Sequence, residues 1–161
     1  MQIILGSLKI THARSSLHVI AQYIKLSRAP RIRRIHFLNK MASKWDKELA
    51  SEICAWIQRA TEESVPSGDP TSFAEKLDDG QILCRLANKI KPGSIKKVNK
   101  MKMPFQKMEN IGFFSDFMRE YGVQAEYGFV TVDLYEKQNV PQVLIALKWL
   151  KVEAEKKGVK I

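Results

Sequence analysis

The stretch "LDDGQILCRLANKIKPGSIKKVN", residues 77–99, combines a helix with the turn that ends it. Its apolar residues recur at spacings of three and four, which predicts one buried helical face. That face is made by Ile82, Leu83, Leu86 and Ile90. We expect Asp78 to cap the start of the helix and Pro92-Gly93 to end it. A lysine-rich connection follows directly.

Three further segments show the same helical spacing of apolar residues. They predict helices over residues 44–61, about 105–121 and about 141–156, and Ser43 is expected to cap the first of them. The segment 64–72 has the composition of a turn. The β-branched run at 130–132 is short and has no partner strand, so we favour a loop and a short helix there. The fold class predicted is all-α, with four principal helices and two or three short ones.

Charge divides the chain near Met41. Residues 1–40 hold eight of the 27 Lys and Arg residues and no Asp or Glu, whereas the rest of the chain holds all 17 acidic residues. We therefore expect a basic, acid-free N-terminal extension over 1–40 outside the core, a domain over 41–156 and a short tail over 157–161. The extension has three interpretations: a mitochondrial transit segment, a basic arm that contacts anions, or a stretch without a role upstream of a natural start at Met41.

The residue types needed for catalysis are scarce in the domain. All three histidines lie within the first 40 residues, which removes the commonest general base and metal ligand from residues 41–161. Cys54 and Cys84 lie in helical patterns without a partner at ligand spacing, so we interpret them as reduced core residues. No run of 18 apolar residues exists, so no transmembrane segment is predicted. We expect no enzymatic activity, no catalytic residue, no metal and no cofactor.

Four segments, taken in order, carry a resemblance to a known family. They are "ASEICAWI" (50–57), residues 77–99, "FQKMENIGFFSDFMREYGV" (105–123) and "TVDLYEKQNVPQVLIALKWL" (131–150). Together they resemble a calponin-homology (CH) domain over about residues 43–155, of the single-domain type found at the start of calponin, transgelin and myophilin. The resemblance implies a core that contains Trp45, Trp56, Leu83, Leu86, Ile111, Phe114, Leu134, Leu144 and Leu147.

The resemblance also implies partners and a location. It implies a cytoplasmic, cytoskeleton-associated protein, often of muscle, that associates with filamentous actin and contributes to filament organisation or to the regulation of contraction. Relatives usually continue into a basic segment and short calponin-type repeats, so we expect only weak actin binding by this chain alone. The alternative is a signalling or scaffold adaptor that binds another protein without direct contact with actin. We expect a monomer.

The connection "KIKPGSIKKVNKMKM", residues 89–103, is the candidate binding surface, because no acid occurs between Gly80 and Met108. A basic surface attracts an acidic polymer such as the actin filament and makes binding salt-dependent. A solvated face and a contact with an anionic membrane leaflet are the alternatives. Nucleic acid is not expected, since the run lacks interleaved aromatic residues. The candidate residues are Lys89, Lys91, Lys96, Lys97, Lys100, Lys102 and Lys107.

Overall fold

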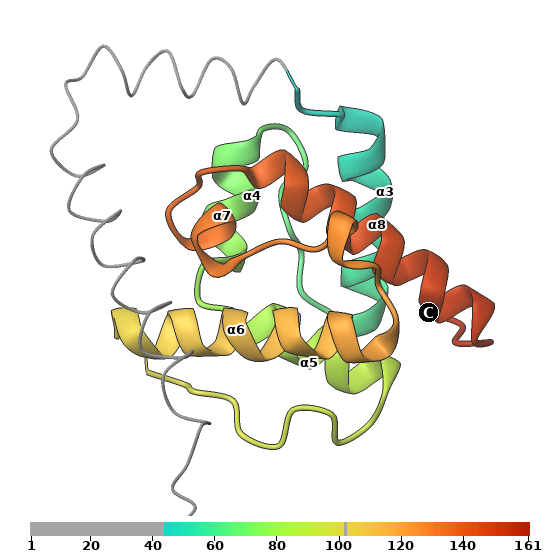
Figure 1. Cartoon of the computed structure of the whole chain (residues 1–161). Coiled ribbons are helices and arrows are strands. Elements are labelled where there is room, and N and C mark those ends of the chain that lie inside the picture. Colours follow the sequence, from blue (N-terminus) through green and yellow to red (C-terminus); the bar gives the residue numbers. More distant parts are fainter. Residues whose placement is uncertain (1–43, 102) are drawn as a thin grey trace, which may run out of the picture. The chain divides into compact units, whose positions relative to one another are not determined.

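The computed structural model describes residues 44–101 and 103–161, and these residues form only helices and connecting loops (Figure 1). Four helices are long: α3 (Lys47–Thr61), α5 (Gln81–Ile90), α6 (Pro104–Tyr121) and α8 (Val140–Lys156). Three are short: α4 (Pro70–Leu77), the 3₁₀ helix η1 (Ala125–Tyr127) and α7 (Thr131–Tyr135). The predicted all-α class, with four principal helices and two or three short ones, is confirmed for the described residues. The predicted extension over 1–40 and Ser43 lie outside the described residues.

The core lies where α5 packs against α3 and α6, and where α8 packs against α3, α4 and α7. All nine side chains that the sequence analysis placed in the core are buried, and the most exposed of them is Trp45, at 9%. The Trp45 indole packs edge-on against Phe73 of α4 with 5.2 Å between ring centroids, and its Nε1 donates to the Ser67 carbonyl at 3.0 Å. These contacts attach the loop before α4 to the start of α3.

The caps of two helices differ from the prediction. α3 begins at Lys47 because Asp46 is its N-cap, whose Oδ1 accepts the N–H of Leu49 at 2.9 Å. Asp78 does not cap α5: it is the C-cap of α4, and Gly80 is the N-cap of α5. The prediction of Asp78 as the α5 cap was therefore wrong. The α4–α5 turn needs a left-handed residue before α5 begins, and glycine supplies it.

The segment predicted only as a turn contains the start of α4. Asp69 is the N-cap of this helix, and its Oδ1 accepts the N–H groups of Thr71 and Ser72 at 2.9 Å each. Pro70 occupies the first helical turn, where its missing N–H has no cost. The turn composition of residues 64–72 is thus a loop followed by a helix start, because both use Asp, Pro and Ser.

Candidate functional site: the lysine-rich loop between α5 and α6

The lysine-rich connection runs back alongside α6, from the end of α5 to the start of α6 (Figure 1). Lys89 lies in the last turn of α5, and Lys91 is the C-cap of that helix. The other described lysines of the connection, Lys96, Lys97 and Lys100, follow in a segment without regular secondary structure. All five side chains are exposed. The loop is therefore a basic edge along one side of α6.

The first half of the loop is held by the side chain of Asn88, in α5. Its Oδ1 accepts the N–H of Ile95 at 2.9 Å, and its Nδ2 donates to the Ile95 carbonyl at 2.9 Å. The amide thereby pairs with both backbone groups of one residue, as a neighbouring strand would. The Ile95 side chain is 7% exposed, so it points inward and packs. Lys96 and Lys97 follow directly on this fixed residue.

The second half of the loop is held in the same way by Asn110, in α6, which is 1% exposed. Its Oδ1 accepts the N–H of Asn99 at 2.9 Å, and its Nδ2 donates to the carbonyls of Asn99 at 2.9 Å and Asp79 at 2.8 Å. Asn99 in turn donates from Nδ2 to Glu109 at 2.6 Å. Asn110 thus joins three segments: α6, the loop and the α4–α5 turn.

Gly80 allows this junction to form. Its φ of +68° lies in the left-handed region, and a Cβ built on it would lie 2.6 Å from the Cβ of Asn110. A side chain at this position would therefore push α6 away from the α4–α5 turn. The Asp-Asp-Gly turn at 78–80 therefore contacts Asn110 through the Asp79 carbonyl and the close approach at Gly80.

Two of the basic residues in the run are neutralised within the domain. Lys107 Nζ pairs with Asp78 Oδ2 at 2.8 Å, and Arg85 pairs with Glu63 at 3.1 Å. Six further lysines lie between Gly80 and Met108, and the five of them that are described form no ion pair with another described residue. Lys102 lies outside the described residues. We call the surface formed by the remaining described lysines the lysine face, and it consists of Lys89, Lys91, Lys96, Lys97 and Lys100.

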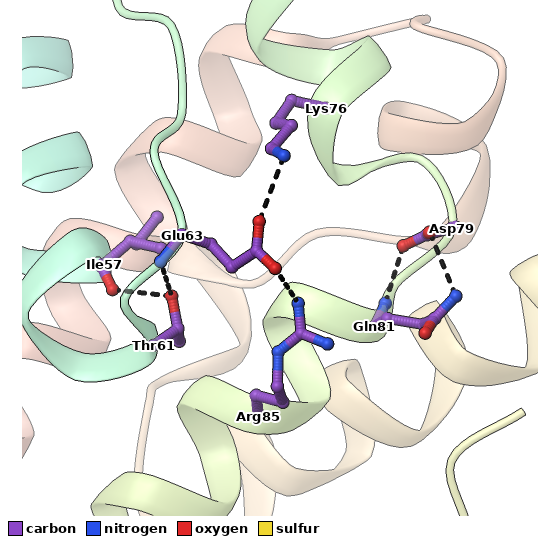
Figure 2. A network of polar contacts seen from close by, with 7 residues as sticks. All are labelled: Ile57, Thr61, Glu63, Lys76, Asp79, Gln81 and Arg85. Carbon is purple, nitrogen blue, oxygen red and sulfur yellow. Dashed lines mark hydrogen bonds and ion pairs between the residues drawn. The ribbon is translucent and has the colours of Figure 1, made fainter. Parts of the chain in front are cut away.

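Glu63 explains why Arg85 is not part of the lysine face. Figure 2 shows its carboxylate between Lys76 of α4 and Arg85 of α5, at 3.1 Å from each. The hydrogen bond from Lys76, and the charges of Lys76 and Arg85, lower the pKa of the Glu63 carboxyl. Asp79 lies away from the Glu63 carboxylate and accepts two hydrogen bonds from Gln81 (Figure 2). The network holds α4 and α5 together after the end of α3.

An open groove of about 560 Å³ separates the first half of the loop from α6. Lys91, Lys96 and Lys97 line the loop side, and Asp116 and Glu120 line the helix side. Aromatic residues of α6 contribute the apolar part of its lining, namely Phe113, Phe117 and Tyr121. The groove therefore combines an apolar lining with basic residues on the loop and acidic residues on α6.

The two cysteines are buried free thiols. Burial raises the pKa of Cys54 to about 11 and that of Cys84 to about 12, so both are protonated at neutral pH. Within the described ranges, no group of three His, Cys, Asp or Glu side chains is arranged to hold a metal ion. None of the described helices is both long and apolar enough to span a bilayer.

Sequence reasoning missed the asparagines. Asn88 and Asn110 carry no charge and match no binding motif, so charge patterning passes over them. A signal was present for Asn110, which lies on the buried side of α6 with Ile111, Phe114 and Phe117. A polar residue on an apolar helical face needs buried partners, because an unpaired amide in the core is costly.

The described helices form an all-α domain, and comparison with known proteins places this domain in the calponin-homology class. The family model of the calponin homology (CH) domain matches residues 47–154. The chain belongs to the calponin-homology domain family. This confirms the family assigned from the sequence, while the boundaries at 41 and 156 stay predictions.

Two relatives support the assignment. The chain is 41% identical to Muscle-specific protein 20 of Drosophila melanogaster over 104 residues, covering 65% of this chain and 55% of the relative. It is 42% identical to Myophilin of Echinococcus granulosus over 105 residues, covering 65% of this chain and 54% of the relative. The chain thus spans about half the length of the curated relatives it matches.

Two solved structures from Schizosaccharomyces pombe share the fold. The calponin-homology domain of Rng2 superposes with a TM-score of 0.61 at 24% identity, covering 69% of each chain. The calponin-homology domain of an IQGAP protein gives a TM-score of 0.63 at 23% identity, covering 74% of this chain and 75% of the other. At these identities the likeness supports the fold alone.

Proposed function

We propose that this chain is a non-enzymatic, actin-associated cytoskeletal protein that contributes to actin filament organisation or to the regulation of muscle contraction. It works in the cytoplasm, as a monomer, and the lysine face contacts the filament. Family membership supports the cytoskeletal role, and the names of the two relatives, Muscle-specific protein 20 and Myophilin, support the muscle setting. The observation that carries the proposal is the lysine face itself. Its five lysines are exposed, form no ion pair among the described residues, and lie at the end of α5 and on the loop that two asparagines fix.

The contact is expected to be weak and sensitive to salt. Each exposed ion pair contributes between about 0 and 1 kcal/mol, and salt screens exposed charges beyond about 8–10 Å at physiological ionic strength. The lysine face therefore raises the encounter rate with an acidic filament more than it holds the complex together. Firm attachment would require further contacts outside the lysine face.

Co-sedimentation of the full chain with filamentous actin, at low and at physiological salt, tests the proposal. Charge reversal by Lys96→Glu, Lys97→Glu and Lys100→Glu should reduce the pelleted fraction strongly at low salt. The matched control reverses three exposed lysines that form no ion pair in the described structure, Lys47, Lys148 and Lys160. Both variants change the net charge equally, and both keep the basic residues 1–40.

Equal loss in the two variants would show that net charge, and not the lysine face, governs filament association. No pelleting of the unchanged chain at either salt would refute direct actin binding.

The groove between the loop and α6 favours a second candidate function, a signalling or scaffold adaptor. The groove has an apolar lining, basic residues on its loop side and acidic residues on its α6 side. Such a groove suits a short protein segment better than it suits a smooth charged surface. Under this alternative, replacing an apolar groove residue by a charged one, as in Phe113→Arg, abolishes capture of the partner and leaves actin pelleting unchanged. Actin binding lost on the same substitution would argue against a separate adaptor site.

A further inference from the structure

Large apolar side chains are concentrated at the point where the loop meets α6. Met101 is 62% exposed, Met103 is 55% exposed and Phe105 is 69% exposed. The other large apolar side chains that are exposed in the described part of the chain are Val130, at 61%, and Ile145, at 37%, and both lie on other segments. Single exposed apolar residues are ordinary, whereas a cluster of them marks a surface that contacts another phase or molecule. We call Met101, Met103 and Phe105 the apolar tip.

The surroundings of the apolar tip are positively charged. Lys100 precedes Met101 directly, and Lys96 and Lys97 lie earlier on the same loop. The first turn of α6 contains no acidic residue, and its N-cap, Met103, provides no side-chain hydrogen bond. The first turn therefore contributes no carboxylate of its own to offset the positive end of the helix dipole. Apolar and cationic groups thus occur together at one end of the loop.

The tip is also held at both ends. Asn110 fixes the backbone of Asn99 just before it, and the ion pair between Lys107 and Asp78 holds the first turn of α6 just after it. Little conformational freedom of the flanking backbone remains to be lost when the tip binds, which favours association. The described residues on either side of the tip are therefore fixed to the rest of the domain.

We propose that the apolar tip and the adjoining lysines bind the surface of an anionic phospholipid bilayer. Met101, Met103 and Phe105 enter the boundary between headgroups and acyl chains, while Lys96, Lys97 and Lys100 contact the anionic headgroups. A bilayer accepts protruding side chains without shape complementarity, and flexible methionines adapt to it. A protein partner would have to supply a recess for three side chains that are each more than half exposed. This inference shares Lys96, Lys97 and Lys100 with the proposed filament contact, but it does not require that contact.

A fluorescent probe at the tip tests the proposal in the full chain. The probe is an environment-sensitive NBD group on Phe105→Cys, with the same group on Lys148→Cys as the control. Lys148 is an exposed residue of α8, which Figure 1 shows on the other side of α6 from the loop. Because Cys54 and Cys84 are buried, the introduced thiol is the accessible one among the described residues. A local probe is needed since the basic residues 1–40 can attract anionic vesicles by themselves.

We expect the emission of the probe at 105 to shift to the blue with vesicles of phosphatidylcholine and phosphatidylserine. Pure phosphatidylcholine vesicles should cause no shift, and the probe at 148 should respond to neither. Replacing Lys96, Lys97 and Lys100 by alanine should lower the partition constant from the probe titration by about fivefold per lysine. Met101→Ser with Met103→Ser should remove the shift, and the matched pair Val130→Ser with Ile145→Ser should leave it.

Three results would overturn the proposal. Vesicle binding without a shift at 105 would assign the binding to another part of the chain. Equal shifts at 105 and 148 would show that no particular face inserts. A shift at 105 with actin filaments but not with anionic vesicles would make the tip a protein contact.

Discussion

Replacing Asn110 with alanine should destabilise the domain more than any exposed substitution. The amide makes three hydrogen bonds of 2.8–2.9 Å in a site where it is 1% exposed, and alanine leaves the Asn99 N–H and two carbonyls without these partners. At about 1 kcal/mol per bond, and more for a group that stays buried and unpaired, the expected loss is about 3–5 kcal/mol. That is a large share of the roughly 5–15 kcal/mol that stabilises a typical domain.

Denaturant unfolding followed by tryptophan fluorescence measures this loss, because Trp45 and Trp56 are buried. Hydrogen exchange then shows whether the Asn99 amide loses protection before the core does. The control is Asn139→Ala, since Asn139 is exposed and makes no side-chain capping bond. It should change the free energy of unfolding by less than about 0.5 kcal/mol.

Asn110→Asp separates hydrogen bonding from cavity formation, because the side chain keeps its shape. The carboxylate still accepts the Asn99 N–H but faces the carbonyls of Asn99 and Asp79, to which Asn110 donates. It should be destabilising at neutral pH and regain stability in acid, where the protonated carboxyl can donate again. The reasoning fails if Asn110→Ala costs less than about 1 kcal/mol, the value of a single ordinary hydrogen bond.

Three further predictions concern the frame of the domain. Gly80→Ala should cost at least about 2 kcal/mol in unfolding free energy, because it combines a left-handed φ with a 2.6 Å approach to Asn110, whereas Gly68→Ala, with open space around it, should be nearly neutral. The backbone N–H and hydroxyl of Ser72 lower the pKa of Asp69, so its cap is fully effective above the unfolded-state pKa of about 3.9 and is lost as the pH falls through the lower folded pKa. Asp69→Ala should therefore cost about 1 kcal/mol at neutral pH, with a difference from the unchanged chain that vanishes in acid unfolding measurements. Cys54 and Cys84 should stay unreactive toward Ellman's reagent until denaturant exposes them, and rapid labelling of the folded chain would contradict their burial.

The long helices were predictable because each carries an apolar face at helical spacing, and this spacing would not give a continuous apolar face in a strand. α4 was harder: it has only eight residues and begins in a segment rich in Pro, Ser, Gly and Asp. Helix starts and turns use the same residue types, so composition alone cannot separate them. The cap of α5 was misplaced since the choice among Asp78, Asp79 and Gly80 depends on how α6 packs against the turn, which is a tertiary contact.

The sequence showed the lysine-rich loop as a run of basic residues, but it did not show which of these residues form ion pairs within the domain. Lys107 and Arg85 look like the other basic residues in the sequence, yet each meets a carboxylate more than 20 positions away in the chain. Long-range ion pairs of this kind follow from the packing of α4, α5 and α6. That the lysine face binds a partner stays a prediction until the co-sedimentation variants are measured.

Order and charge in the loop depend on different residues. Asn88 and Asn110 fix the backbone by hydrogen bonds, while the lysines point outward and form no ion pair among the described residues. Exposed, unpaired lysines add little to the free energy of unfolding, and replacing several of them relieves mutual repulsion. Substitutions in the lysine face can therefore change binding without unfolding the domain, whereas substitutions at Gly80 or Asn110 disturb the frame first. Loss of binding in a lysine variant of unchanged stability would consequently report on the contact itself.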